Sequence, residues 1–89
     1  MQQRDENAVK VQVQFFSRLR DLSGVSECEL RVPDGSTVAD LLQILYARMP
    51  ALRDWDKSIL IGAGVEFVTR DYLLQSGDRI SIMPPVQGG

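Results

Sequence analysis

The sequence contains no histidine and only one cysteine among its 89 residues. The absence of histidine excludes imidazole acid–base catalysis and imidazole metal sites. A single cysteine excludes an internal disulfide and a multi-cysteine zinc site. Any chemistry of this chain must therefore use carboxylates, hydroxyls, lysine, the one thiol or a chain terminus.

Long apolar runs and an excess of basic residues are also missing. Ten Lys and Arg residues against twelve Asp and Glu residues give a formal charge of −2, unlike the basic balance of nucleic-acid-binding domains. No run approaches the roughly 20 apolar residues of a membrane-spanning helix. The first residues, MQQRDENA, are polar and include acids, unlike a signal peptide. We expect a cytosolic, single-domain protein in which residues 1–8 form a flexible N-terminal extension.

Three segments alternate apolar and polar residues, as half-buried β-strands do: residues 9–16, 28–32 and 79–83. Between the first two, residues 17–24 predict a short helical turn, so these strands are expected to form a hairpin with a long connection. Residues 58–68 contain two glycines and predict a strand, a turn near Gly64 and a brief further strand.

The best-specified element is a helix that follows the turn sequence PDGST. Thr37 is a good N-cap, and Asp40 places negative charge in the first turn, where the helix dipole favours it. Pro50 ends the helix. The apolar residues recur at intervals of three and four: Val38, Leu41, Leu42, Leu45 and Met49.

One amphipathic helix must lay its apolar stripe on one face of this small sheet, which predicts an α+β fold. The element order fits the β-grasp, or ubiquitin-like, arrangement over residues 9–83. Residues 51–58 predict a loop in which Asp54 and Asp56 are solvated rather than bound to a metal. Cys28 shares a strand face with apolar residues, so we expect it in the core as a small hydrophobe.

Two adjacent phenylalanines end the first predicted strand and must face opposite ways. Phe15 has the parity of the core valines, so Phe16 points to the other face of the sheet. There it serves either a partner interface or simple packing. Met83 has the opposite parity from Ile80 and Ile82 and is a candidate for the same surface.

The final residues read IMPPVQGG, and we take the diglycine as the end of the chain. Glycine has no Cβ, so Gly88 and Gly89 fit a channel that any side chain would block. Two prolines stiffen the base of this segment and lower the entropy lost on insertion. We predict an extended tail that enters a partner's site, with an inert, frayed end as the alternative. The tail comprises Pro84, Pro85, Val86, Gln87, Gly88 and Gly89.

Three stretches resemble the small subunits of molybdopterin synthase, a family of ubiquitin-like sulfur carriers: FFSRLRDLSG at 15–24, DGSTVADLL at 34–42 and LQSGDRISIMPPVQGG at 74–89. The resemblance implies that an activating enzyme of the ubiquitin-activating type adenylates Gly89 with ATP. Sulfur would then replace AMP to give a thiocarboxylate. The thiocarboxylate would donate its sulfur to the pyranopterin precursor of the molybdenum cofactor.

The same resemblance implies the partners. The chain would be a non-catalytic small subunit docked on a large synthase subunit, in a heterotetramer, with a separate sulfur donor. No bound cofactor, metal, nucleic acid or membrane is expected. Arg20 matches an arginine of the family and either clasps an acidic partner group or is solvated. The alternatives are a thiamin-type sulfur carrier, a ubiquitin-like protein modifier that uses the same glycine, and a binding module with an inert tail.

Overall fold

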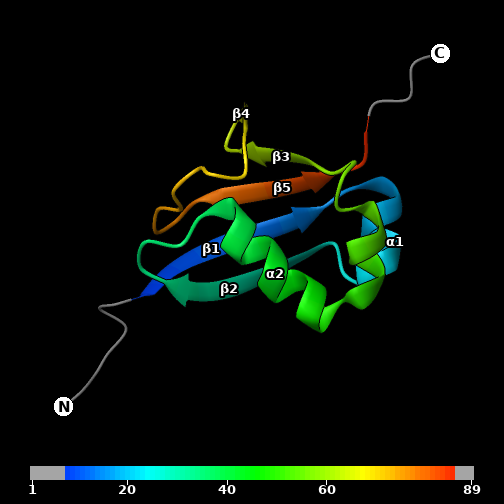
Figure 1. Ribbon diagram of the computed structural model, residues 1–89, viewed down its shortest axis with the longest axis horizontal. Helices are drawn as coiled ribbons and strands as arrows, with labels where there is room; N and C mark the ends of the chain where they lie inside the picture. Colours follow the sequence, from blue (N-terminus) through cyan, green and yellow to red (C-terminus); the bar gives the residue numbers. More distant parts are fainter. Residues whose placement is uncertain (1–7, 86–89) are drawn as a thin grey trace.

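A computed structural model describes residues 8–85 of the chain. Within this range the elements are β1 (Ala8–Phe15), α1 (Ser17–Ser23), β2 (Glu27–Pro33), α2 (Val38–Arg48), the 3-10 helix η2 (Pro50–Trp55), β3 (Leu60–Ala63), β4 (Glu66–Val68) and β5 (Arg79–Met83). The strands form one mixed sheet in the order β2-β1-β5-β3-β4, and α2 crosses one face of it (Figure 1). This is the predicted α+β architecture.

The strand β1 pairs with two neighbours that lie at different distances along the chain. It is antiparallel to β2, to which it is joined through α1, and parallel to β5. Strand β3 pairs antiparallel with both β5 and β4. The first two strands therefore form the predicted hairpin with a long connection. The β1–β5 pairing instead joins segments that are far apart in the sequence.

The core lies between the sheet and α2. The buried residues of β1 alternate with more exposed ones, and β5 does the same with Ile80 and Ile82. The predicted helical stripe is buried except for Met49, which is half-buried at the end of the helix. Cys28, expected in the core, is also only half-buried and packs against it.

A complete capping box begins α2. The Thr37 hydroxyl accepts the Asp40 N–H at 3.4 Å, and the Asp40 carboxylate accepts the Thr37 N–H at 2.9 Å. The first two N–H groups of the helix donate to the carbonyls of Tyr72 and Arg70, at 3.0 and 2.9 Å. The segment after β4 is therefore tied to the start of α2.

The turn before β5 is organised by Asp78. Its carboxylate accepts the Gln75 N–H at 2.8 Å and the Tyr72 hydroxyl at 2.9 Å. Gly77 supplies a φ of 90°, which favours glycine, and its N–H donates to the Lys10 carbonyl at 2.8 Å. The Gly-Asp pair that carries part of the family resemblance therefore holds the turn that leads β5 onto β1.

Several strand ends and one element differ from the sequence-based prediction, and β2 extends one residue beyond the predicted 28–32 at each end. Strand β1 begins at Ala8, which was assigned to the N-terminal extension, and ends at Phe15 rather than at residue 16. Residues 51–58 were predicted as a loop, but residues 50–55 form η2. Pro50 both ends α2 and begins η2, because its fixed φ suits the first position of a new helical turn.

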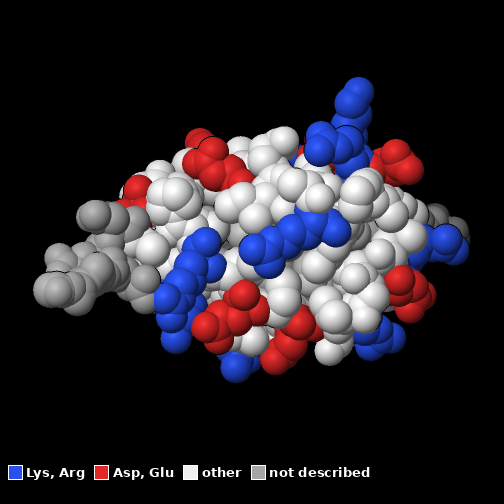
Figure 2. Space-filling view, turned by 90° about the horizontal axis from the view of Figure 1, so that it is seen from below, with Lys and Arg blue, Asp and Glu red and all other residues white. Residues whose placement is uncertain are grey.

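Charged side chains of both signs are interspersed over the face shown in Figure 2, which looks onto the molecule from below. That face has no large area of a single charge sign. No helix within residues 8–85 has the length and apolar character needed to cross a membrane.

Candidate partner-binding site

An apolar groove lies on the sheet face that points away from the core. Ile80 and Ile82 are buried in the core, so Ser81 and Met83 on the alternate positions of β5 point to the opposite face. The groove has a volume of about 170 Å3. Its lining residues come from the end of β1, the β3–β4 hairpin and β5: Phe16, Gly62, Gly64, Val65, Glu66, Phe67, Ser81 and Met83.

The walls of the groove are large apolar side chains exposed to solvent. Phe67 is 73% exposed, Val65 is fully exposed and Phe16 is 36% exposed. Aromatic residues and methionine are enriched in protein–protein interfaces, and grouped exposed apolar residues mark such surfaces. The groove therefore has the composition of a docking site for another protein.

The floor of the groove is backbone at Gly62. In the strand register Gly62 lies between Ser81 of β5 and Phe67 of β4. A Cβ at position 62 would lie 3.3 Å from Met83 Cε and 3.6 Å from Ser81 Cβ. The missing side chain therefore lets the end of the Met83 side chain lie close over the Gly62 backbone.

The position of Phe16 is fixed by backbone contacts on both sides. Its N–H donates to the Ile82 carbonyl at 3.1 Å, and its carbonyl accepts the Leu19 N–H at 3.0 Å. The next residue, Ser17, has a φ of 53°, which is uncommon for a residue other than glycine. This local strain turns the chain from β1 into α1 and leaves Phe16 at the rim of the groove.

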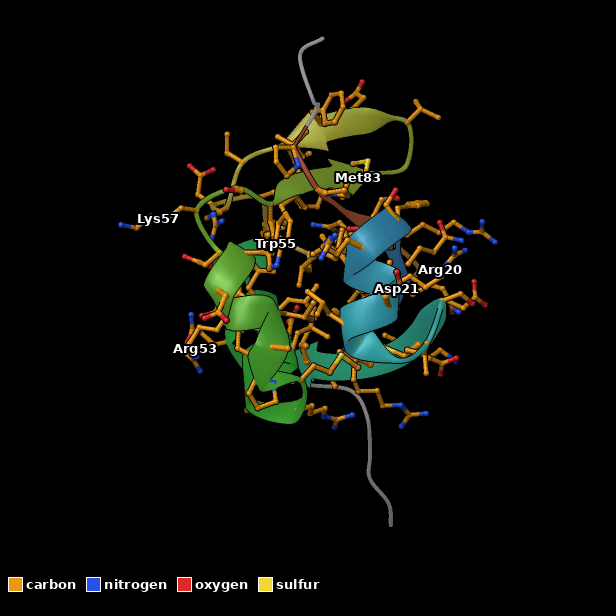
Figure 3. All side chains as sticks on the ribbon, turned by 90° about the vertical axis from the view of Figure 1, so that its right-hand side faces the viewer. Arg20, Asp21, Arg53, Trp55, Lys57 and Met83 are labelled. Carbon is orange, nitrogen blue, oxygen red and sulfur yellow. The ribbon has the colours of Figure 1, made fainter. Side chains whose placement is uncertain are left out.

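Arg20 borders a second hollow on the other side of Phe16, together with Glu27. Figure 3 shows Met83 near the β3–β4 hairpin and Arg20 on α1, while Arg53 and Lys57 lie on the opposite side of this view. Within residues 8–85 no ion pair engages Arg20. The predicted interface residues Phe16 and Met83 thus share one groove, and Arg20 is next to it.

The base of the predicted tail adjoins the groove. Pro84 and Pro85 directly follow the groove residue Met83, and both are half-buried. The other tail residues lie outside the described range, so their role stays a prediction: Val86, Gln87, Gly88 and Gly89.

The sequence analysis did not identify Val65 and Phe67 as site residues. A signal was available in the sequence. Val65 lies in the turn after Gly64, and Phe67 lies on the very short strand that follows it. Large apolar residues on such a strand have little opportunity to reach a core. Their exposure therefore indicates an intermolecular role.

The remaining chemical candidates have structural roles. Burial raises the pKa of the Cys28 thiol, which keeps it protonated and poorly nucleophilic. Asp56, expected to be solvated, instead accepts the Tyr46 hydroxyl at 2.5 Å and pairs with Arg70. Burial, followed by this hydrogen bond, raises the pKa of Tyr46 to about 12. Within residues 8–85 no cluster of three or more acidic or thiol side chains is suited to hold a metal ion.

Comparison with known proteins identifies the family. The ThiS family model matches residues 13–89, which include the tail. The chain belongs to the ThiS family. A molybdopterin synthase sulfur carrier subunit from Arabidopsis thaliana is 32% identical to this ThiS-family chain over 85 residues, covering 96% of this chain and 88% of the relative.

Solved structures of related proteins confirm the ubiquitin-like β-grasp fold of this ThiS-family protein. A putative molybdopterin converting factor, subunit 1, from Pyrococcus furiosus is 34% identical, with a TM-score of 0.80 over 88% of this chain and 99% of that chain. The small archaeal modifier protein 1 from Methanosarcina acetivorans is 29% identical, with a TM-score of 0.76 over 92% and 98%. The family resemblance drawn from the sequence is confirmed.

Proposed function

We propose that this ThiS-family protein is the sulfur carrier subunit of molybdopterin synthase and that the carboxylate of Gly89 carries the sulfur. The observation that carries the proposal is the position of the apolar groove at the base of the PPVQGG segment. The named relatives, which align over nearly the whole chain, support the same function. A carrier needs a docking surface beside the segment that bears its reactive group.

The chemistry begins with a poor acyl donor, because a carboxylate has no good leaving group. An activating enzyme of the ubiquitin-activating type would transfer AMP from ATP to the Gly89 carboxylate and release pyrophosphate. A sulfide-level nucleophile from a separate donor would attack the acyl carbon, release AMP and form the thiocarboxylate. The thiocarboxylate sulfur would then pass to the pyranopterin precursor, and hydrolysis would return the carboxylate.

The proposal divides the roles between this chain and its partners. The groove would hold the domain on the large synthase subunit while six tail residues reach up to about 20 Å into that subunit's site. ATP would be used by the activating enzyme, and the precursor would bind the large subunit. This chain would act as a non-catalytic, substrate-like subunit in a heterotetramer.

Protein modification is a second candidate, and the similarity to the small archaeal modifier protein 1 favours it. A modifier would use the same activation of Gly89 but would transfer the acyl group to lysines, which would give conjugates of high mass. A thiamin-type carrier would also share the activation. Rescue of a mutant that lacks the molybdenum-cofactor carrier, but not of one that lacks the thiamin carrier, would separate the two pathways.

The deciding experiment supplies the protein with a purified activating enzyme, ATP and a sulfur donor. Tandem mass spectrometry should place one sulfur-for-oxygen replacement on Gly89. Reactions without ATP are the control, and fragmentation separates the product from methionine oxidation. A Gly89 that stays unmodified under these conditions would contradict the carrier function and favour a binding module with an inert tail.

A further inference from the structure

An ion pair joins the segment that precedes β3 to the segment that follows β4. We propose that Asp56 and Arg70 act as a clasp that holds Phe67 in place for partner docking. Both are positioning residues, because they act through the hairpin and do not line the groove between Phe67 and Met83. The inference rests on the proposed function, since it concerns the groove as a docking site.

The hairpin carries a groove wall on a weakly held strand. Strand β4 has three residues, lies at the edge of the sheet and, within residues 8–85, pairs only with β3. Its residues Glu66 and Phe67 are exposed. Short edge strands with few buried contacts open most readily, so the position of Phe67 needs support from outside the strand.

Asp56 and Arg70 supply this support from the two sides of the hairpin. Asp56 lies before β3, and Arg70 lies two residues after β4. Arg70 Nη1 donates to Asp56 Oδ1 at 2.7 Å, and Arg70 Nη2 donates to the Asp56 carbonyl oxygen. Two bonds from one planar guanidinium fix direction as well as distance. They therefore close the base of the hairpin.

The clasp is also fixed to the core. Asp56 Oδ1 accepts the hydroxyl of Tyr46, a fully buried residue of α2, and the Arg53 guanidinium lies 5.3 Å from the centre of the Tyr46 ring. The Arg70 carbonyl accepts the Ala39 N–H at the start of α2. The hairpin base is therefore linked to both halves of the helix that organises the core.

The partial exposure of the Asp56 and Arg70 side chains limits how much the clasp stabilises the whole domain. The Asp56 and Arg70 side chains are each 39% exposed, and ion pairs at this exposure add little to global stability. A small free energy has a larger relative effect on local opening of a three-residue edge strand than on unfolding of the whole domain. The arrangement therefore suits local positioning of Phe67.

Hydrogen exchange tests the clasp without any partner. Arg70→Met keeps a long side chain but removes the donors, so backbone amides of β3 and β4 should exchange about fivefold faster while those of β1 and β2 stay unchanged. Glu29→Gln is the matched control, because it removes the exposed Lys10–Glu29 pair, whose atoms are 3.6 Å apart, at the other side of the sheet. Unchanged hairpin exchange, or equal acceleration throughout the domain, would overturn the proposal.

A double-mutant cycle with the purified large subunit of the synthase tests the consequence for docking. Arg70→Met should weaken binding about fivefold when Phe67 is present and less than about twofold in the Phe67→Ala background. Arg70→Lys, which retains a charged donor, should restore part of the affinity. Equal losses in both backgrounds would show that the clasp does not act through Phe67. Failure of the unmutated protein to bind would instead contradict the proposed function, and hydrogen exchange would still decide the clasp.

Discussion

Position 62 has no side chain, so Phe67 and Met83 border a groove floored by bare backbone. The backbone there does not have the left-handed conformation that requires glycine, unlike Gly24, Gly35, Gly64 and Gly77. Folding therefore does not demand glycine at 62. The glycine at this position therefore shapes the groove rather than a turn.

Gly62→Ala should separate docking from folding. The added Cβ would lie 3.3 Å from Met83 Cε, the end of a flexible side chain that can move aside, so the stability should change by less than about 0.5 kcal/mol. The shallower groove should bind the large subunit about fivefold more weakly, as measured by calorimetry. Gln12→Ala, on the polar part of the same sheet face, is the control. A large fall in melting temperature, or unchanged affinity, would contradict this interpretation.

The sequence predicted the sheet face of some groove residues but not of others. Strand parity was enough for Phe16 and Met83, because each follows a run of alternating residues whose buried members are clear. It was not enough for Phe67, because β4 is too short to show alternation. The partners of Asp56 could not be predicted, because Tyr46 and Arg70 come from separate elements that only the tertiary structure brings together.

Among the elements, α2 was predictable almost to the residue. The capping signals at Thr37 and Asp40 and the stop at Pro50 act locally, so the sequence alone contains them. The 3-10 helix η2 was missed because its six residues lack a long apolar repeat. The β1–β5 pairing was also beyond pattern analysis, because it depends on contacts between distant segments.

Asp56 contacts residues of other elements, and these contacts predict that the protein loses stability in acid. Hydrogen bonds from Tyr46 and then from Arg70 hold the pKa of Asp56 below its ordinary value of 3.8. The folded-state pKa is thus below the unfolded-state pKa, so this stabilisation is complete above about pH 4 and is lost as the pH falls through the lower folded-state value.

Urea unfolding at pH 7 and pH 3 measures this effect. Between pH 7 and pH 3 the free energy of unfolding should fall by up to about 1 kcal/mol more for the wild-type protein than for Asp56→Asn. The difference is modest because the carboxylate is partly exposed. Asp54→Asn, in the same segment, is the control and should behave like the wild type. Identical pH profiles for the wild type and Asp56→Asn would refute the linkage.

For the whole molecule, we expect the fold to be independent of the proposed reactive end. Within residues 8–85 the buried core extends from Val9 to Ile82. Deletion of Gly88 and Gly89 should leave the melting temperature within about 2 °C of the wild-type value and abolish sulfur loading. Circular dichroism and mass spectrometry measure the two results. A clear loss of stability would mean that the tail supports the fold.

The central place of β5 also affects how the protein is made. This strand lies between β1 and β3, so the β2–β1 and β3–β4 pairs have no strand to join them until residues 79–83 leave the ribosome. Completion of the sheet therefore waits for residues 79–83. A chain that terminates before residue 79 lacks both the joining strand and the diglycine. Such a fragment would be open to proteases and, under the proposed function, would offer the activating enzyme no diglycine to load.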